Sequence, residues 1–192
     1  MALTARFERA LTFAAQLHVD QVRKGTDIPY MAHLLGVASL VLEYGGGEDE
    51  AIAALLHDAV EDQGGPATRA RIQALFRRTV ADIVDGCTDT DETPKPPWRA
   101  RKEAYLAHLP TAAPAVLLVS AADKLYNATS ILRASREVGA DVWSRFSAGR
   151  GEQLWYYRAL VTAFRTAGAP APLVDELDLV MTELEAQGRA TT

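Results

Sequence analysis

Apolar residues recur at helical spacing along most of this 192-residue chain, and runs of glycine and proline interrupt them. One apolar stripe, from about Met31 to Tyr44, is followed by three consecutive glycines, and the stripe that starts near Asp49 ends at Gly64-Gly65-Pro66. Glycine adopts the left-handed conformation that ends many helices, and proline lacks the N–H group that continues one. No segment indicates convincing strand pairing, so the predicted fold class is all-α.

The same periodicity gives approximate helix bounds. A first helix contains Phe7 and His18 and is expected to end near Gly25. The others are expected over 31–44, 49–63, 68–76, 80–87, 98–109, 115–133 and 170–184. The aliphatic run at 115–119 could also be a short buried strand, but the alanines around it and the length of the run favour a helix.

One internal segment and the end of the chain do not fit a helix. Residues 88–97 combine acidic, threonine and proline residues, which neither a helix nor a central strand tolerates. We expect either an ordered loop or a mobile lid there. Residues 188–192 are polar, and we expect this tail to fray, which leaves 1–187 as a single domain.

The composition limits the functions open to the chain. Lys and Arg total 20 against 25 Asp and Glu, a net charge of −5, whereas binding to nucleic acid or to an anionic membrane needs a clustered excess of positive charge. The single cysteine, Cys87, excludes an intrachain disulfide and a thiolate metal cluster. No apolar run approaches the roughly 20 residues of a membrane span, so we expect a cytoplasmic protein.

Four ligand-type residues lie close together near residue 60. His57 and Asp58 are adjacent, and Glu61 and Asp62 follow one turn later. On a continuous helix of about 100° per residue, all four project onto one face. Three carboxylates and an imidazole on one face would repel one another, and a divalent cation would relieve that repulsion. The alternative is a solvated acidic helix end, although the apolar residues around the cluster argue for burial.

A metal site needs further ligands, and His33 and Asp123 are the candidates. Taken singly, each is better explained as a hydrogen-bonded, partly buried polar residue or a helix cap. Together with His57 and Asp58 they form a mixed nitrogen and oxygen set that suits manganese, iron or zinc.

Five ordered motifs carry a family resemblance. They are AAQLHVDQVRKGTDIPY at 14–30, HLLGVA at 33–38, AALLHDAVED at 53–62, VDGCT at 84–88 and ADKLYN at 122–127. Over roughly residues 3–165 the chain resembles the HD-domain metal-dependent phosphohydrolases, with their H…HD…D signature. More narrowly, it resembles the RelA/SpoT hydrolase domain and the small alarmone hydrolases, which implies a compact helical HD bundle.

The resemblance also implies roles for individual residues. The metal ligands would be His33, His57, Asp58 and Asp123, with manganese the expected ion and iron, zinc or another divalent ion as alternatives. Glu61 and Asp62 would be the acid/base pair, without a choice between them. The expected nucleotide contacts are Arg23, Lys24, Lys124, Asn127 and Ser130, whereas the three cations among them could also be solvated surface residues. His18 is expected to be a structural hydrogen bonder.

The activity implied by the resemblance is removal of the 3′-pyrophosphate from guanosine tetra- or pentaphosphate by water activated at the metal. The products would be GDP or GTP and pyrophosphate. One alternative is an HD phosphohydrolase acting on another nucleotide, such as a nucleoside monophosphate, a triphosphate or NADPH. An alternative from another class is a non-catalytic nucleotide-binding regulator. The expected partner is a small-molecule nucleotide, and the sequence leaves a homo-oligomer open.

Overall fold

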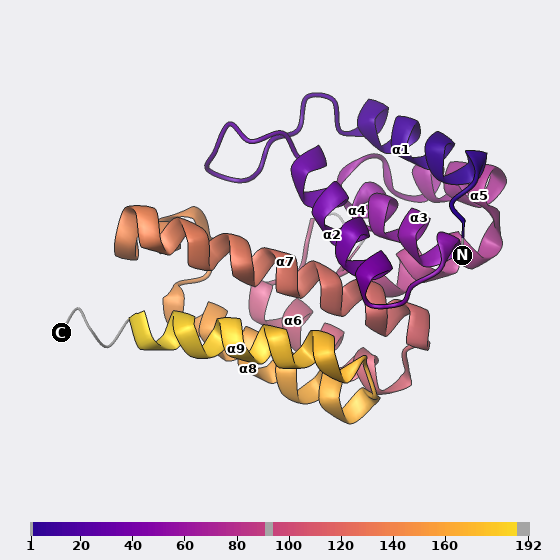
Figure 1. Cartoon of the computed structure of the whole chain (residues 1–192). Coiled ribbons are helices and arrows are strands. Elements are labelled where there is room, and N and C mark those ends of the chain that lie inside the picture. Colours follow the sequence, from indigo (N-terminus) through magenta and orange to yellow (C-terminus); the bar gives the residue numbers. More distant parts are fainter. Residues whose placement is uncertain (1, 91–93, 188–192) are drawn as a thin grey trace.

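A computed structural model describes residues 2–90 and 94–187 (Figure 1). Its regular structure is helical, and the β contact found among the described residues is an isolated bridge between Val22 and Pro29. The all-α prediction is therefore confirmed. The helices are α1 (Ala5–Leu17), α2 (Met31–Glu43), α3 (Glu48–Leu56), α4 (Ala59–Asp62), α5 (Gly65–Cys87), α6 (Trp98–His108), α7 (Pro114–Val138), α8 (Arg150–Ala167) and α9 (Ala171–Gln187), with short 3₁₀ turns at Leu109–Thr111 and Gly139–Arg145.

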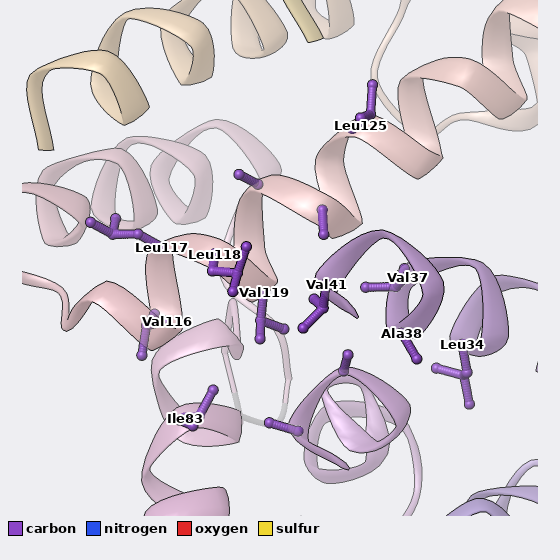
Figure 2. Packing of buried hydrophobic residues seen from close by; sticks show 14 of the residues in the cluster. Leu34, Val37, Ala38, Val41, Ile83, Val116, Leu117, Leu118, Val119 and Leu125 are labelled. Carbon is purple, nitrogen blue, oxygen red and sulfur yellow. The ribbon is translucent and has the colours of Figure 1, made fainter. Parts of the chain in front are cut away.

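The long helix α7 is the centre of the packing. It lies against α2, α3 and α5 on one side and against α8 and α9 on the other (Figure 1). Its first turns are apolar and buried at consecutive positions, from Val116 to Val119 and at Ala121 and Ala122. Figure 2 shows Val119 next to Val41, at the end of the apolar stripe of α2 that also contains Val37 and Leu34, and Val116 next to Ile83 of α5. A helix that is apolar all round must be enclosed by others, and this places Asp123 in the interior of the protein.

The segment after α1 differs from the prediction. The helix ends at Leu17 and does not continue towards Gly25. Residues 18–30 instead form an irregular loop in which Arg23 N–H donates to Ile28 O at 2.8 Å and Tyr30 N–H donates to Gln21 O at 2.9 Å. These bonds join the segment near Gln21 and Arg23 to the segment near Ile28 and Tyr30. The N–H and carbonyl groups involved are therefore hydrogen-bonded without a helix.

The predicted helix over 49–63 is also wrong as a continuous element. Its first turn is well determined, because Glu50 accepts the Gly47 N–H at 3.0 Å and three acids lie at the positive end of the helix dipole. The helix then breaks at His57 and Asp58, between α3 and α4. His57 Nδ1 lies 2.8 Å from the Ala54 carbonyl oxygen, the group that Asp58 N–H would bond in a continuing helix.

Most other boundaries agree with the prediction or extend it, although α8 was not among the expected helices. The expected interruption after residue 76 is a kink within α5, where Arg77 has φ 79° and ψ 164°. Residues 115–119 belong to α7, which excludes the strand alternative, and α7 continues to Val138. The tail at 188–192 lies outside the described residues, as do 91–93 within the expected loop or lid.

Among the described residues, no helix combines the length and the apolar character that a membrane span requires.

The crossing of α2 and α7 depends on a glycine. A Cβ atom at Gly36 would lie 1.9 Å from Cε2 of Tyr126, and the Tyr126 ring lies 5.3 Å from the His33 ring. The absence of a side chain at Gly36 therefore allows the two helices to bring His33 close to Asp123.

We predict that Gly36→Ala lowers the free energy of unfolding by about 1–3 kcal/mol, because the added methyl group overpacks this crossing. Thermal or denaturant unfolding measures it. Gly151→Ala in α8 is the matched control, since a Cβ atom there meets nothing within 4 Å. Equal stability of the Gly36→Ala variant and the original protein would contradict the prediction.

Candidate metal centre

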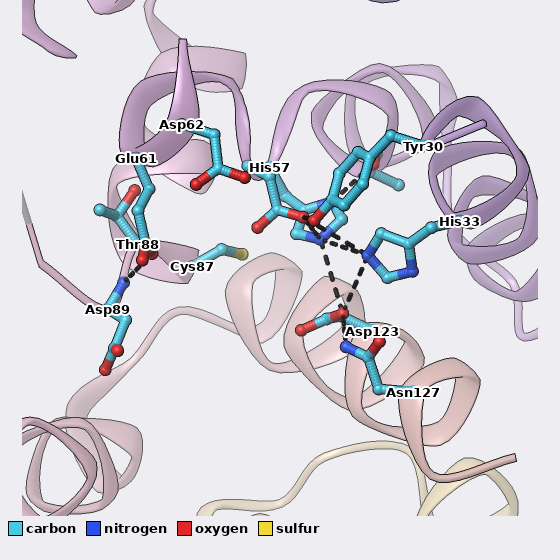
Figure 3. A network of polar contacts seen from close by, with 12 residues as sticks. Tyr30, His33, His57, Glu61, Asp62, Cys87, Thr88, Asp89, Asp123 and Asn127 are labelled. Atoms are coloured by element: carbon cyan, nitrogen blue, oxygen red, sulfur yellow. Dashed lines mark hydrogen bonds and ion pairs between the residues drawn. The ribbon is translucent and has the colours of Figure 1, made fainter. Parts of the chain in front are cut away.

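Four side chains predicted as ligands meet in the interior (Figure 3). His33 comes from the first turn of α2, His57 and Asp58 from the break between α3 and α4, and Asp123 from α7. The two Nε2 atoms lie 3.2 Å apart. Asp58 Oδ2 lies 3.4 Å from His33 Nε2 and 3.0 Å from His57 Nε2, and Asp123 Oδ1 lies 3.3 and 3.5 Å from the same two atoms.

This donor set fits a divalent metal ion. Atoms bonded about 2.0–2.2 Å from one ion lie about 3–3.5 Å apart, which matches the separations in the cluster. The Nδ1 proton of His57 is directed at the Ala54 carbonyl oxygen, so Nε2 is the nitrogen that faces the cluster and that would bind a metal ion in place of a proton. One atom each from His33, His57 and Asp58 lies within 4.8 Å of the others, and a cation there would hold together nitrogen and oxygen atoms that otherwise repel.

The charges of the cluster shift its pKa values. Burial lowers the pKa of His57, but the carboxylates of Asp58 and Asp123 outweigh burial and hold that pKa well above its usual value. Burial raises the pKa of Asp58, and the imidazoles of His57 and His33 more than offset this, so its pKa is well below the usual range. The Asp58 carboxyl group is thus held in the ionised form that binds a cation.

Tyr30 belongs to this centre although the sequence reasoning assigned it no role. Its hydroxyl donates to Asp58 Oδ2 at 2.6 Å. Burial and then the charge of Asp58 raise the pKa of Tyr30, so the hydroxyl keeps its proton and remains a donor. The signal in the sequence was weak: Tyr30 precedes His33 by one helical turn.

Asp123 is fixed by two neighbours on α7. Lys124 Nζ lies 2.5 Å from Asp123 Oδ2, and Asn127 Nδ2 donates to Oδ1 at 2.6 Å. Burial raises the pKa of Asp123. Lys124 and then the two imidazoles lower it by more, so the pKa is well below its usual range. The Lys124 side chain is largely buried against Asp123, so Lys124 is not a solvated surface residue.

The other predicted nucleotide contacts border an open cleft of about 550 Å³. Arg23 Nη2 donates to Asn127 Oδ1 at 2.7 Å, which links the cleft to Asp123. Ser130 also lines the cleft, and its hydroxyl donates to the Tyr126 carbonyl oxygen at 2.9 Å. Lys24 lines the same cleft and is exposed.

Glu61 and Asp62 project from α4 in different directions, contrary to a single shared helical face. Glu61 pairs with Lys95 at 2.7 Å and lies 3.4 Å from the Asp89 N–H group. Asp62 accepts from Gln21 Nε2 at 2.9 Å and lines the cleft. Asp62 is exposed at the residue level, yet partial burial of its carboxyl group, followed by the charges of Asp58 and Glu61, raises its pKa.

Comparisons with known proteins agree with this geometry. The sequence model of a family described as HD domain matches residues 10–153. A Xenopus tropicalis protein named guanosine-3′,5′-bis(diphosphate) 3′-pyrophosphohydrolase MESH1 is 40% identical over 67% of this chain and 70% of its own length. The human protein of the same name is 35% identical, over 69% and 73%.

Two solved structures share the fold. One, described as a metazoan ortholog of SpoT that hydrolyses ppGpp, has a TM-score of 0.79 at 24% identity and covers 95% of this chain and 97% of its own. The protein lmo0812 from Listeria monocytogenes has a TM-score of 0.71 at 32% identity, over 79% and 97%. The motif order, the helical fold and the matched family model lead to one conclusion: this chain belongs to the HD-domain family of metal-dependent phosphohydrolases.

Proposed function

We propose that the protein removes the 3′-pyrophosphate from guanosine tetra- and pentaphosphate, releasing pyrophosphate and GDP or GTP. The single observation that carries the proposal is the meeting of His33, His57, Asp58 and Asp123 beside an open cleft with basic residues. The names of the MESH1 relatives support the choice of substrate. A cytoplasmic location and a possible homo-oligomer stay predictions.

We propose the same four side chains as the ligands of one divalent ion, with manganese as the expected metal. When bound, such an ion polarises a water molecule and a phosphoryl oxygen. Tyr30 and Lys124 orient the two carboxylates by binding their Oδ2 atoms. Fixed carboxylates hold the ligand set in place before the substrate arrives.

The chain then has to move protons and hold the nucleotide. Water adds to the phosphorus next to the 3′ oxygen, the bond between that oxygen and phosphorus breaks, and the 3′ oxygen leaves with a proton. Glu61 or Asp62 accepts the proton of the attacking water. Arg23, Lys24, Asn127 and Ser130 border the cleft in which the nucleotide would lie.

We expect the manganese-loaded protein to release pyrophosphate and GDP from guanosine tetraphosphate in equal amounts. Chromatography of the products, with phosphate and pyrophosphate assayed separately, checks this. Inorganic phosphate from a nucleoside monophosphate or from NADPH would instead support an HD phosphohydrolase with another substrate. Binding without any turnover would support a regulatory protein.

Replacing His57 by alanine should abolish metal binding, because it removes a central nitrogen ligand. After dialysis, we expect about one ion in each original chain and none above background in the variant. Elemental analysis gives the metal content. The control is Asp175→Ala on α9, where the side chain is largely exposed. A variant that retains its ion would rule out His57 as a ligand.

Glu61→Gln should keep the metal and lower kcat by about 10²-fold, if Glu61 is the proton acceptor. Lys95→Met is the matched control, because it breaks the same ion pair and leaves the carboxylate. We expect a much smaller effect in this control. An unchanged rate for Glu61→Gln would assign the proton transfer to Asp62, which Asp62→Asn then tests.

A further inference from the structure

We propose that Gln21 is a positioning residue for Asp62, and that His18 and Gln63 fix the orientation of the Gln21 side-chain amide. The inference rests on the proposed function, because it gives a reason why Asp62 can take part in hydrolysis. His18 and Gln21 both lie in the irregular loop at 18–30, and Asp62 and Gln63 lie at the end of α4.

The contacts form a closed set around one amide group. Gln21 Nε2 lies 2.9 Å from Asp62 Oδ2. Gln21 Oε1 lies 2.6 Å from His18 Nδ1 and 2.7 Å from Gln63 Nε2. Both ends of the Gln21 side chain are therefore engaged, the nitrogen by one acceptor and the oxygen by two nitrogen atoms.

Only one assignment of protons satisfies all three contacts. The ionised Asp62 carboxylate can only accept, so the Gln21 atom that faces it must be the NH₂ group. Gln21 Oε1 must then receive two donors, which requires a proton on His18 Nδ1 and the NH₂ group of Gln63. A rotation of the Gln21 amide by 180° would break every one of these bonds, so His18 and Gln63 hold Gln21 in the orientation that serves Asp62.

The second observation concerns the other nitrogen of His18. In a neutral ring with its proton on Nδ1, Nε2 is an acceptor, and this atom is buried without a hydrogen-bond partner among the described residues. The His18 side chain is only 2% exposed and stacks on the Tyr30 ring at 5.3 Å. A buried acceptor without a partner destabilises the fold. An apolar ring would fill the same space without that cost, so stability alone does not account for a histidine here.

The arrangement also connects the two sides of the proposed active site. The loop that contains Gln21 continues to Arg23, which binds Asn127, and to Tyr30, which binds Asp58. The bond from Gln21 to Asp62 fixes the position of α4 relative to this loop. A shift of about 1 Å at such a contact is enough to lower a reaction rate strongly.

The first test replaces His18 in two ways. His18→Phe keeps the stacked ring and removes both nitrogens, and we expect kcat for guanosine tetraphosphate to fall about 10-fold or more, with an unchanged or higher melting temperature. His18→Asn can offer an N–H donor in place of Nδ1, and we expect it to restore most of the rate. His108→Phe at the exposed end of α6 is the matched control for the substitution.

The second test is a double-mutant cycle. Gln21→Leu removes the donor to Asp62 at a half-buried loop position, and we expect kcat to fall at least as far as in His18→Phe. Because His18 acts through Gln21, the double variant should be no slower than Gln21→Leu alone. Additive losses would overturn the proposal, as would a His18→Phe variant with the original kcat or with parallel losses of rate and stability.

A substrate-free readout separates this proposal from the proposed function. The side-chain amide ¹H–¹⁵N resonance of Gln21 should move in His18→Phe and remain near its original position in His18→Asn. If the original protein hydrolyses no guanosine tetraphosphate but the resonance behaves in this way, the substrate assignment fails and the orientation of Gln21 by His18 stands. An unchanged resonance in His18→Phe overturns the orienting role of His18 whatever the substrate is.

Discussion

The structure depends on the burial of two imidazoles and two carboxylates in one contact cluster. His33 and His57 are almost fully buried, and their Nε2 atoms face each other at 3.2 Å. Nitrogen lone pairs and carboxylate oxygens packed so closely destabilise a protein interior unless positive charge lies among them. A divalent cation bound by these side chains, as we propose, would supply that charge at the point where α2, the break after α3, and α7 converge.

The packing of the helices brings the four side chains of the cluster together. The apolar first half of α7 is enclosed by the other helices, so Asp123 is held in the interior. Gly36 allows the close approach of α2 to α7 that brings His33 within reach. The His57 side chain donates a hydrogen bond to the Ala54 carbonyl oxygen, and α3 ends at Leu56. The residues that set the packing of α2, α3 and α7 therefore also set the positions of the four proposed metal ligands.

Most helices and the four-residue cluster could be predicted from the sequence, because apolar periodicity and the H…HD…D order carry that information. The break at His57 could not, since it arises from a side-chain bond that competes with the helix. Because Glu61 and Asp62 follow that break, projecting them from His57 along one continuous helix does not give their directions. Gln21 was also missed, because nothing in its local sequence shows that its amide would reach Asp62 from a loop 41 residues away.

Anomalous X-ray diffraction from crystals of the manganese-loaded protein, recorded at the manganese absorption edge, tests the central claim most directly. A single strong peak is predicted about 2.0–2.3 Å from His33 Nε2, His57 Nε2, and the nearest carboxylate oxygens of Asp58 and Asp123. No peak among these four side chains, at full metal loading, would contradict the account.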